Sequence, residues 1–260
     1  MRRFALLLVV SVMGNAALAL AQSGSTSDAL AVSFAQRAIA ALTQGTAVSD
    51  VTLSANVVST FASSHNTGTG TFQAKGTSES RVNLSLTSGA RSEIRGLTTY
   101  GLPTGGWQLN GAALTAYPQH NCWTDAAWFF PSFSSLSQTT NPAFVFKYVG
   151  QEQYNGTNVQ HIEVSQVSSQ NPTLARLSTM DFYLDAVSFL PLDMKFVVHA
   201  DKDMNTNIQT EVRFSSYQSV SGIQIPFYFQ RLINGNLDLD VKVTSAVLNS
   251  GLSDSIFSVQ

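Results

Sequence analysis

The chain has 260 residues, of which 44% are hydrophobic and only 12% charged, with 14 basic and 16 acidic side chains. This balance lacks the basic surface that binding to phosphates requires, so we expect no nucleic-acid partner. The length suits one large domain or two small ones, and a surface solvated by Ser, Thr, Asn and Gln is typical of exported β proteins rather than of helical bundles.

The first residues have the pattern of a secretory signal peptide. Arg2 and Arg3 precede an apolar run over residues 4–13, and residues 19–21 (Ala-Leu-Ala) offer the small side chains that signal peptidase recognises. The run is too short to remain in a bilayer as a spanning helix. We therefore predict a signal peptide over residues 1–21 and a mature, soluble product in the periplasm or outside the cell.

One helix and a series of strands follow in the first half of the mature chain. Apolar residues repeat at four-residue spacing behind the candidate N-capping residues 25–28, which predicts an amphipathic helix over residues 28–43. The period then changes to two, and turn residues separate short strands, as in an antiparallel meander. These strands are predicted over residues 51–57, 68–74, 81–87 and 91–97.

Alternation is cleaner in the second half and predicts a sheet with one buried and one wet face. The apolar members are Phe144, Phe146 and Tyr148; Met180, Phe182 and Leu184; Leu192, Met194, Phe196 and Val198; Ile223, Ile225, Phe227 and Phe229; and Leu237, Leu239, Val241 and Val243. The intervening polar residues should face water, among them Asp193, Lys195, His199, Asp238, Asp240 and Lys242. About ten to twelve strands, with no internal repeat and no linker, predict one domain over residues 22–260.

Residues 118–142 break this pattern with a crowd of aromatic side chains that has no period of two. Its members are Trp123, Trp128, Phe129, Phe130 and Phe133. Thr124 and Asp125 are candidate caps of a short helix that Pro131 would end. Two interpretations stay open for this insert: a loop that plugs one end of the sheet core, or an apolar lid over a ligand cavity.

Signatures of catalysis and of metal binding are few in this sequence. The four histidines lie far apart, and there is neither a Gly-x-Ser-x-Gly elbow nor a glycine-rich phosphate loop. The single Cys122 cannot form an internal disulfide, and we expect it to be buried. Residues 201–207 match the start of a calcium loop, but Thr206 and Val212 occupy the Gly and Glu positions, which favours a hairpin turn. We expect no enzyme, no cofactor and no metal.

Four short motifs follow one another in the second half. They are Gly150-x-Glu152-x-x-x-Gly156 before a strand; Leu184-Asp185 leading to Leu190-Pro191; Tyr217 with Gly222-Ile-Gln-Ile-Pro226; and Asn249, Asp254 and Phe257 near the end. In this order they resemble the LolA-like superfamily of outer-membrane lipoprotein-sorting proteins, and the resemblance covers residues 144–257 best. It implies a mostly β fold: a strongly curved antiparallel sheet, an unclosed half β-barrel, with an N-terminal helix and short helices covering the concave face.

The same resemblance implies a function. Such proteins hold acyl chains of lipoproteins or other lipids in an apolar cavity and carry them across the periplasm, with envelope membrane proteins that deliver or accept the cargo. An acyl chain gains ~0.8 kcal/mol per buried methylene, so apolar lining alone can bind it. The expected cavity and lid residues are Trp123, Trp128, Phe129, Phe130, Phe133, Phe144, Phe146, Phe182 and Phe196.

A lipid sensor on the same scaffold fits these observations as well as a carrier does. The alternative from another class is a secreted, non-catalytic β module that binds a protein or a glycan, in which the aromatic insert is simply core. A cavity of several hundred Å³ would favour lipid binding, and a sheet packed solid would favour the interaction module. A hydrolase ranks third, because no catalytic constellation supports it.

Overall fold

A computed structural model describes residues 26–60 and 65–259. The predicted signal peptide, residues 1–21, lies outside them. All strands join one 13-stranded antiparallel sheet in the order β6-β5-β4-β3-β2-β1-β13-β12-β11-β10-β9-β8-β7. The sheet does not close, because β6 and β7 are its two edges. This confirms the predicted mostly β fold, an unclosed curved sheet, with slightly more strands than expected.

The strands are long, and most are joined to their neighbours by tight turns. They are β1 Asp50–Ser59, β2 Asn66–Lys75, β3 Glu79–Leu86, β4 Gly89–Leu97, β5 Pro103–Leu109, β6 Thr115–Ala116, β7 Phe144–Tyr154, β8 Thr157–Gln166, β9 Met180–Asp185, β10 Pro191–Ala200, β11 Asp203–Val220, β12 Ile223–Ile233 and β13 Asn236–Leu248. Residues 201–202 form the turn between β10 and β11, so the predicted hairpin at the calcium-like motif is confirmed.

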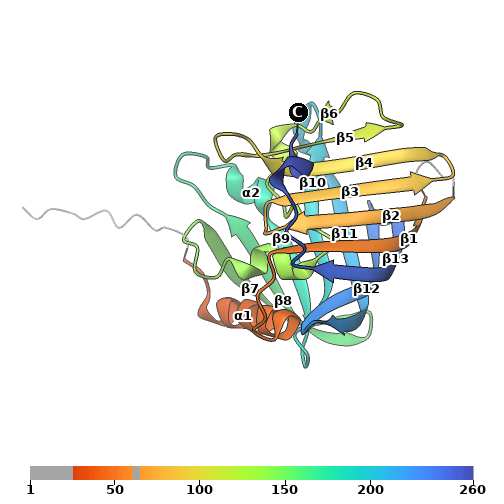
Figure 1. Cartoon of the computed structure of the whole chain (residues 1–260). Coiled ribbons are helices and arrows are strands. Elements are labelled where there is room, and N and C mark those ends of the chain that lie inside the picture. Colours follow the sequence, from red (N-terminus) through yellow and green to blue (C-terminus); the bar gives the residue numbers. More distant parts are fainter. Residues whose placement is uncertain (1–25, 61–64, 260) are drawn as a thin grey trace, which may run out of the picture.

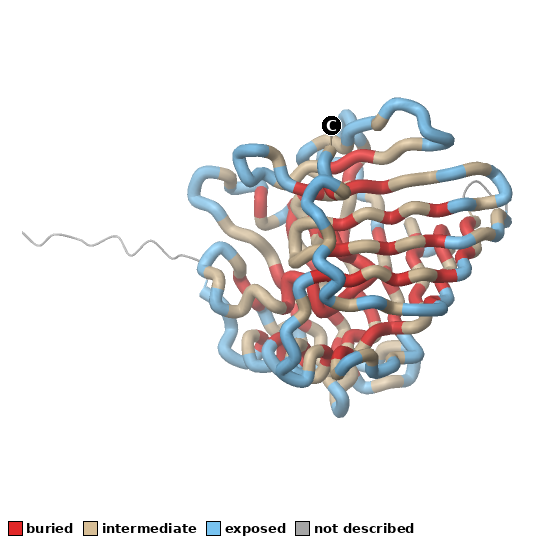
Figure 2. The backbone as a smooth tube through the Cα atoms, in the orientation of Figure 1, coloured by how far each residue is buried: buried red, intermediate tan, exposed pale blue. Residues whose placement is uncertain are grey.

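Alternation along the strands places the apolar side chains on one face of the sheet. Buried and less buried residues alternate along most strands (Figure 2). Across β1 and β13, Ala55 pairs with Val243 and Val57 with Val241, and all four side chains are buried. β-Bulges interrupt the register in β1, β10 and β12, and such bulges bend strands. The sheet therefore curves around its apolar face.

Helix α1 (Ala29–Thr43) confirms the helix predicted over residues 28–43. It buries Ala31, Phe34, Ala35, Ala38 and Leu42 and contacts β7, β8 and β12. β12 lies near the middle of the strand order and β7 at its edge, so the curved sheet brings its edge and its middle onto one helix, which lies at the bottom of Figure 1. The segment before α1 covers part of the β7 edge, where Ser27 Oγ accepts from Phe146 N–H at 3.1 Å.

The convex face carries the last residues of the chain. The 3-10 turn η5 (Asp254–Phe257) lies against β3 and β4, and Phe257 is buried there. A Cβ on Gly96 would stand 2.6 Å from the Phe257 carbonyl oxygen, so glycine is required at this position. Asn249 accepts from Ser49 N–H at 2.7 Å and donates to the Ala47 carbonyl at 3.1 Å. The closing motif thus ties the end of β13 to the start of β1.

Two local predictions are wrong. No helix starts at Thr124; the insert instead folds into three 3-10 turns, η2 Gln119–Asn121, η3 Pro131–Phe133 and η4 Ser135–Ser137. Pro131 begins η3 rather than ending a helix, since a first helical position needs no N–H donor.

The second wrong prediction concerns the polar residues assigned to the wet face. Asp193, His199 and Asp238 are buried. Bulges adjoin all three residues and change the alternation there.

A second, five-residue helix, α2 (Leu174–Ser178), packs on β8 and β10.

Candidate ligand-binding site

The aromatic insert fills the middle of the concave face. Phe129 and Phe130 are completely buried, and Trp128 and Phe133 are nearly so. The ring of Phe72 on β2 lies 5.3 Å from Phe129 and 5.3 Å from Phe229 on β12, and all these rings meet edge to face. Such contacts are the preferred geometry of aromatic pairs in a protein core. The insert therefore joins two strands that β1 and β13 separate in the sheet.

Hydrogen bonds fasten the insert to both arms of the sheet. On one arm, Ser80 Oγ on β3 donates to the Ala126 carbonyl at 2.7 Å, and Arg95 on β4 donates to the Thr124 carbonyl at 3.0 Å. On the other arm, the Asn121 side chain accepts from His199 N–H at 2.7 Å and donates to the His199 carbonyl at 2.8 Å. The insert thereby bridges β3–β4 and β10 across the concave side.

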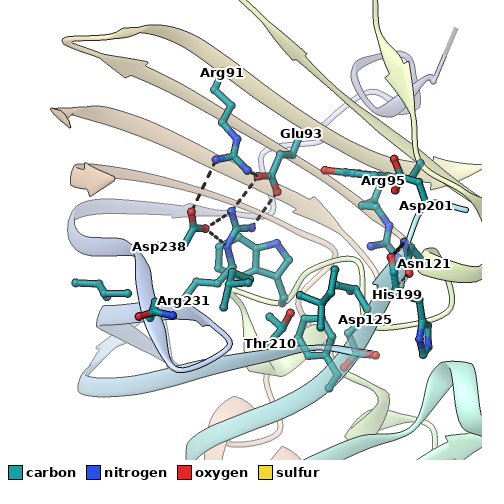
Figure 3. A pocket seen from close by; sticks show the side chains of 18 of the residues that line it. Arg91, Glu93, Arg95, Asn121, Asp125, His199, Asp201, Thr210, Arg231 and Asp238 are labelled. Carbon is teal, nitrogen blue, oxygen red and sulfur yellow. Dashed lines mark hydrogen bonds and ion pairs between the residues drawn. The ribbon is translucent and has the colours of Figure 1, made fainter. Parts of the chain in front are cut away.

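Beside the insert the concave face holds a pocket of about 440 Å³ (Figure 3). Its walls come from β4 on one side and from β10, β11, β12 and β13 on the other. Exposed Asp201 and Asn236 stand among its lining residues, so the pocket opens to solvent there. Six apolar side chains form one continuous part of the lining: Trp128, Phe196, Val198, Ile208, Ile233 and Leu237. We call this space the open-end pocket.

A network of four charged side chains also lines the open-end pocket. The Arg231 guanidinium donates two bonds of 3.0 Å to the two oxygens of Glu93 and one of 2.7 Å to Asp238. Arg91 donates to Glu93 at 2.6 Å, and its other terminal nitrogen lies 3.9 Å from Asp238. The Arg231 guanidinium also lies 4.6 Å from the centre of the Trp128 ring, a cation–π contact.

The pKa shifts of Glu93 and Arg231 both favour the charged forms, although these side chains are buried. Burial alone would raise the pKa of Glu93, but the neighbouring guanidiniums of Arg231 and Arg91 outweigh it and lower the pKa to about 2. The two carboxylates in turn outweigh burial at Arg231 and raise its pKa. Two arginines and two carboxylates balance, so this network, named here the charge quartet, adds no net charge to the pocket.

A second pocket of about 250 Å³ lies on the other side of the segment 123–126. Its lining is more polar and includes Cys122, Gln138, Asn141 and Gln166. Arg95 and Asp125 line both pockets and so form part of the wall between them. Burial raises the pKa of Asp125 to about 7, despite two bonds from Ser135 at 2.9 and 3.3 Å and the nearby charge of Arg95. Cys122 is buried, as predicted, and burial raises the pKa of its thiol.

The structure separates the predicted ligand-binding residues into three groups. Trp128 and Phe196 line the open-end pocket, and Trp123 and Phe144 line the second pocket. The other five belong to the dry core and line neither pocket: Phe129, Phe130, Phe133, Phe146 and Phe182. Their role in ligand binding stays a prediction.

Sequence reasoning missed the charge quartet. One signal was available, because Arg91, Glu93 and Arg95 alternate along a single strand and therefore share one face. A second was Arg231, a charge within an otherwise apolar strand. Each of these patterns also fits a solvent-facing position, so the sequence did not show that β4 and β12 meet.

Another charged cluster lies on the outer face of β7–β10. His161 contacts Glu152 at 2.7 Å and Asp181 at 2.8 Å, and its ring stacks on Tyr183 at 4.3 Å. Lys195 Nζ lies 4.6 Å from the centre of the same tyrosine ring. Within residues 26–60 and 65–259, no group of three or more His, Cys, Asp or Glu side chains is arranged to hold a metal ion.

Comparison with solved structures identifies the fold. No family model matches the sequence, and no curated protein matches it. A domain from Vibrio parahaemolyticus, named for outer membrane lipoprotein sorting, is similar to this chain with a TM-score of 0.56 at 14% identity, over 88% of this chain and 96% of that chain. The chain has the LolA-like fold.

Two further structures resemble this LolA-like fold. A DUF1329 family protein from Desulfovibrio piger has a TM-score of 0.55 at 11% identity, over 88% of this chain and 96% of that chain. A LolA superfamily protein from Nitrosomonas europaea has a TM-score of 0.49 at 10% identity, over 88% and 97%. The resemblance seen in the four sequence motifs is confirmed for the fold by the structures from Vibrio parahaemolyticus and Desulfovibrio piger. Among the described residues, no helix of the LolA-like fold is long and apolar enough to cross a membrane.

Proposed function

We propose that this chain is an exported carrier or sensor that binds acyl chains of lipoproteins or other lipids within the curved sheet. The apolar wall of the open-end pocket carries this proposal. A volume of about 440 Å³ lies within the range of small-molecule sites, ~300–1,000 Å³. Ten methylenes buried there would contribute ~8 kcal/mol before the costs of association. A micromolar dissociation constant needs a net binding free energy of about that size after these costs. An acyl chain with more than ten buried methylenes would therefore be required.

The competing interpretation is a module that binds a protein or a glycan on its sheet surface. It predicts a concave face packed solid by its own side chains. The insert does fill the middle of that face, yet a pocket of several hundred Å³ persists beside Trp128 and Phe196. This pocket favours lipid binding over the interaction module.

We propose further that the aromatic insert is the lid of the cavity, held closed in the ligand-free protein. The insert consists of 3-10 turns and loops, which are not part of the sheet. Its rings occupy the space next to the open-end pocket, so a shift of the insert would extend the apolar pocket toward Phe146 and Phe182. An acyl chain could then replace the contacts that the rings make with the sheet.

The remaining parts of the proposal concern the place and partners of the protein. We propose that residues 22–260 form one mature domain in the periplasm or outside the cell. Envelope membrane proteins would deliver or accept the lipid. Binding rests on apolar burial, and no step of it requires catalysis or a cofactor.

The test is binding of an uncharged lipid to the mature protein. Monopalmitoylglycerol should displace a fluorescent acyl probe, and lipid extracted from the purified protein should be detected by mass spectrometry. Val198→Gln and Ile208→Gln place amides in the apolar wall at half-buried positions and should each weaken binding about tenfold. Val149→Gln, at an exposed position of the β7 edge outside both pockets, is the matched control. A wild-type protein that neither binds monopalmitoylglycerol nor co-purifies with lipid would refute the proposal.

A further inference from the structure

Arg95 is the one arginine of the open-end pocket that the charge quartet leaves out. Arg91 and Arg231 are both paired with Glu93 and Asp238. Within residues 26–60 and 65–259, no carboxylate oxygen lies within 4.0 Å of the Arg95 guanidinium; its hydrogen bond is to the Thr124 carbonyl. Arg95 is therefore a surplus positive charge in a partly enclosed space.

The two carboxyl groups that line this pocket outside the charge quartet form no ion pair with Arg95. Asp125 directs its Oδ2 to Ser135, and burial favours its neutral form. Asp201 lines the pocket from an exposed hairpin turn, where water solvates it. A guanidinium has five donors, and the Thr124 carbonyl takes one bond, so donors remain for an oxyanion.

The sheet makes room for the Arg95 side chain. Gly105 on β5 is directly opposite Arg95 on β4. A Cβ on Gly105 would lie 2.6 Å from Arg95 Cδ and 2.9 Å from Tyr117 Cδ2. The arginine stem and the tyrosine ring thus occupy the space that any larger residue would fill. Tyr117 also lines the open-end pocket and adds a phenol beside the guanidinium.

We propose that the open-end pocket selects lipids with an anionic head group, a carboxylate or a phosphate, and that Arg95 binds that group. This inference rests on the proposed function, since the acyl chain would lie on the apolar wall formed by Phe196, Val198 and Ile208. Both features line the same pocket, with β4 facing β10 and β11 across it (Figure 3). A guanidinium is suited to both head groups, because its planar donors match two oxygens of either.

The test uses two pairs of lipids that differ in charge. Palmitate is compared with palmitamide, and palmitoyl-lysophosphatidate with monopalmitoylglycerol. At pH 7 the wild-type protein should bind the charged member of at least one pair about tenfold more tightly, as expected for a charge-assisted hydrogen bond. A preference within the first pair identifies a carboxylate ligand, and a preference within the second identifies a phosphate ligand.

Variants separate head-group binding from a structural role of Arg95 at Thr124. Arg95→Gln should abolish the preference, because its affinity for the charged lipids should fall about tenfold more than its affinity for the uncharged ones, whereas Arg95→Lys should keep part of the preference because it keeps the charge. Arg37→Gln, an arginine stacked on Phe189 and outside both pockets, should change nothing.

The outcomes distinguish this inference from the proposed function. Equal binding of charged and uncharged lipids by the wild type, or an equal loss for both in Arg95→Gln, overturns the head-group inference and leaves lipid binding intact. Binding of none of the four lipids overturns both.

Discussion

The concave face of this protein has two parts with opposite contents. The middle, which the insert fills, is called here the filled end, and the part that holds the open-end pocket is called the open end. At the filled end, aromatic rings of the insert meet Phe72 and Phe229 edge to face, and the side chains are apolar. At the open end, the same sheet directs Arg91, Glu93 and Arg231 inward beside an apolar wall. One alternating pattern of strands therefore builds both a dry core and a pocket with charged groups.

The difference lies in how each end compensates for removing its side chains from water. Burial of the aromatic rings is itself favourable, and it requires only that their shapes fit together. Buried charges cost free energy unless each finds a partner, and Arg231 has two. A buried ion network gives little net stability compared with well-packed apolar side chains, although removing one partner of such a network is costly.

The largest effect is expected from breaking the charge quartet. Arg231→Leu leaves Glu93 and Asp238 buried without their main partner, which should lower the free energy of unfolding by about 3–5 kcal/mol in urea titrations. Lys75→Leu removes an ion pair that is largely exposed and should change the free energy of unfolding far less. Equal losses in the two variants would show that the quartet is solvated.

The filled end should respond nearly as strongly. Phe130→Ala removes a completely buried ring and should lower the free energy of unfolding by about 3 kcal/mol, whereas Tyr100→Ala, whose side chain is 89% exposed, should have almost no effect. If the insert is the lid, Phe130→Ala should also weaken monopalmitoylglycerol binding per folded molecule. Unchanged affinity beside a large loss of stability would identify the insert as core alone.

A smaller effect is expected where β4 and β5 are closely packed beside the open-end pocket. Gly105→Ala adds a Cβ at 2.6 Å from Arg95 Cδ and at 2.8 Å from the Ile94 carbonyl oxygen. We expect a loss of about 1–2 kcal/mol in thermal unfolding, together with a weaker preference for charged lipids. A double-mutant cycle with Arg95→Ala should give a non-additive energy, and additive losses would argue against contact between these residues.

The smallest effect concerns the wall between the two pockets. The pKa of Asp125 is raised to about 7 in the folded protein, from 3.8. Its stabilising contribution is therefore complete below about pH 4 and is lost as the pH rises through 7. Asp125→Asn removes this dependence. The free energy of unfolding of this variant, relative to that of the wild type, should therefore rise by less than about 1 kcal/mol per pH unit between pH 4 and 7. Parallel stability curves for the two proteins would show that the Asp125 carboxyl is solvated.

Glu93 shifts in the opposite direction and offers an internal check on this pH dependence. Its pKa is lowered to about 2, so its contribution is present above about pH 4.5 and is lost as the pH falls toward 2. The Asp125→Asn substitution should leave this acid limb unchanged.

Patterns that depend on neighbours in sequence were predictable. The helix at 29–43, the alternating strands and the hairpin at 201–202 follow from local periodicity and turn residues. Two motif residues make contacts within a turn or between neighbouring strands. Asp185 accepts from Ser188 N–H at 2.7 Å in its turn, and Tyr217 on β11 donates to the Pro191 carbonyl on β10 at 2.7 Å. The fold could therefore be predicted together with its curved sheet.

The contents of the concave face could not be predicted in the same way. Glu93 and Arg231 are 138 residues apart, and only the curvature of the sheet joins them in a buried ion pair. Asp238 has the alternation of a wet-face residue, yet the register shift between β12 and β13 at Arg231 and Leu232 leaves Asp238 as the extra residue of β13, where it joins the quartet. A strand pattern gives the face of each residue, but it contains no information about the bulges and contacts that decide what that face meets.

The sequence by itself determined the antiparallel sheet, its N-terminal helix and its likeness to the LolA-like fold, because these depend on side-chain period and turn chemistry. Only the tertiary structure decided that the insert lies inside the sheet, that Cys122 and Asp125 lie near the wall between two pockets, and that Arg95 keeps an unpaired charge. These features depend on which residues meet across the cavity, and such long-range contacts follow from the curvature of the whole sheet around its core.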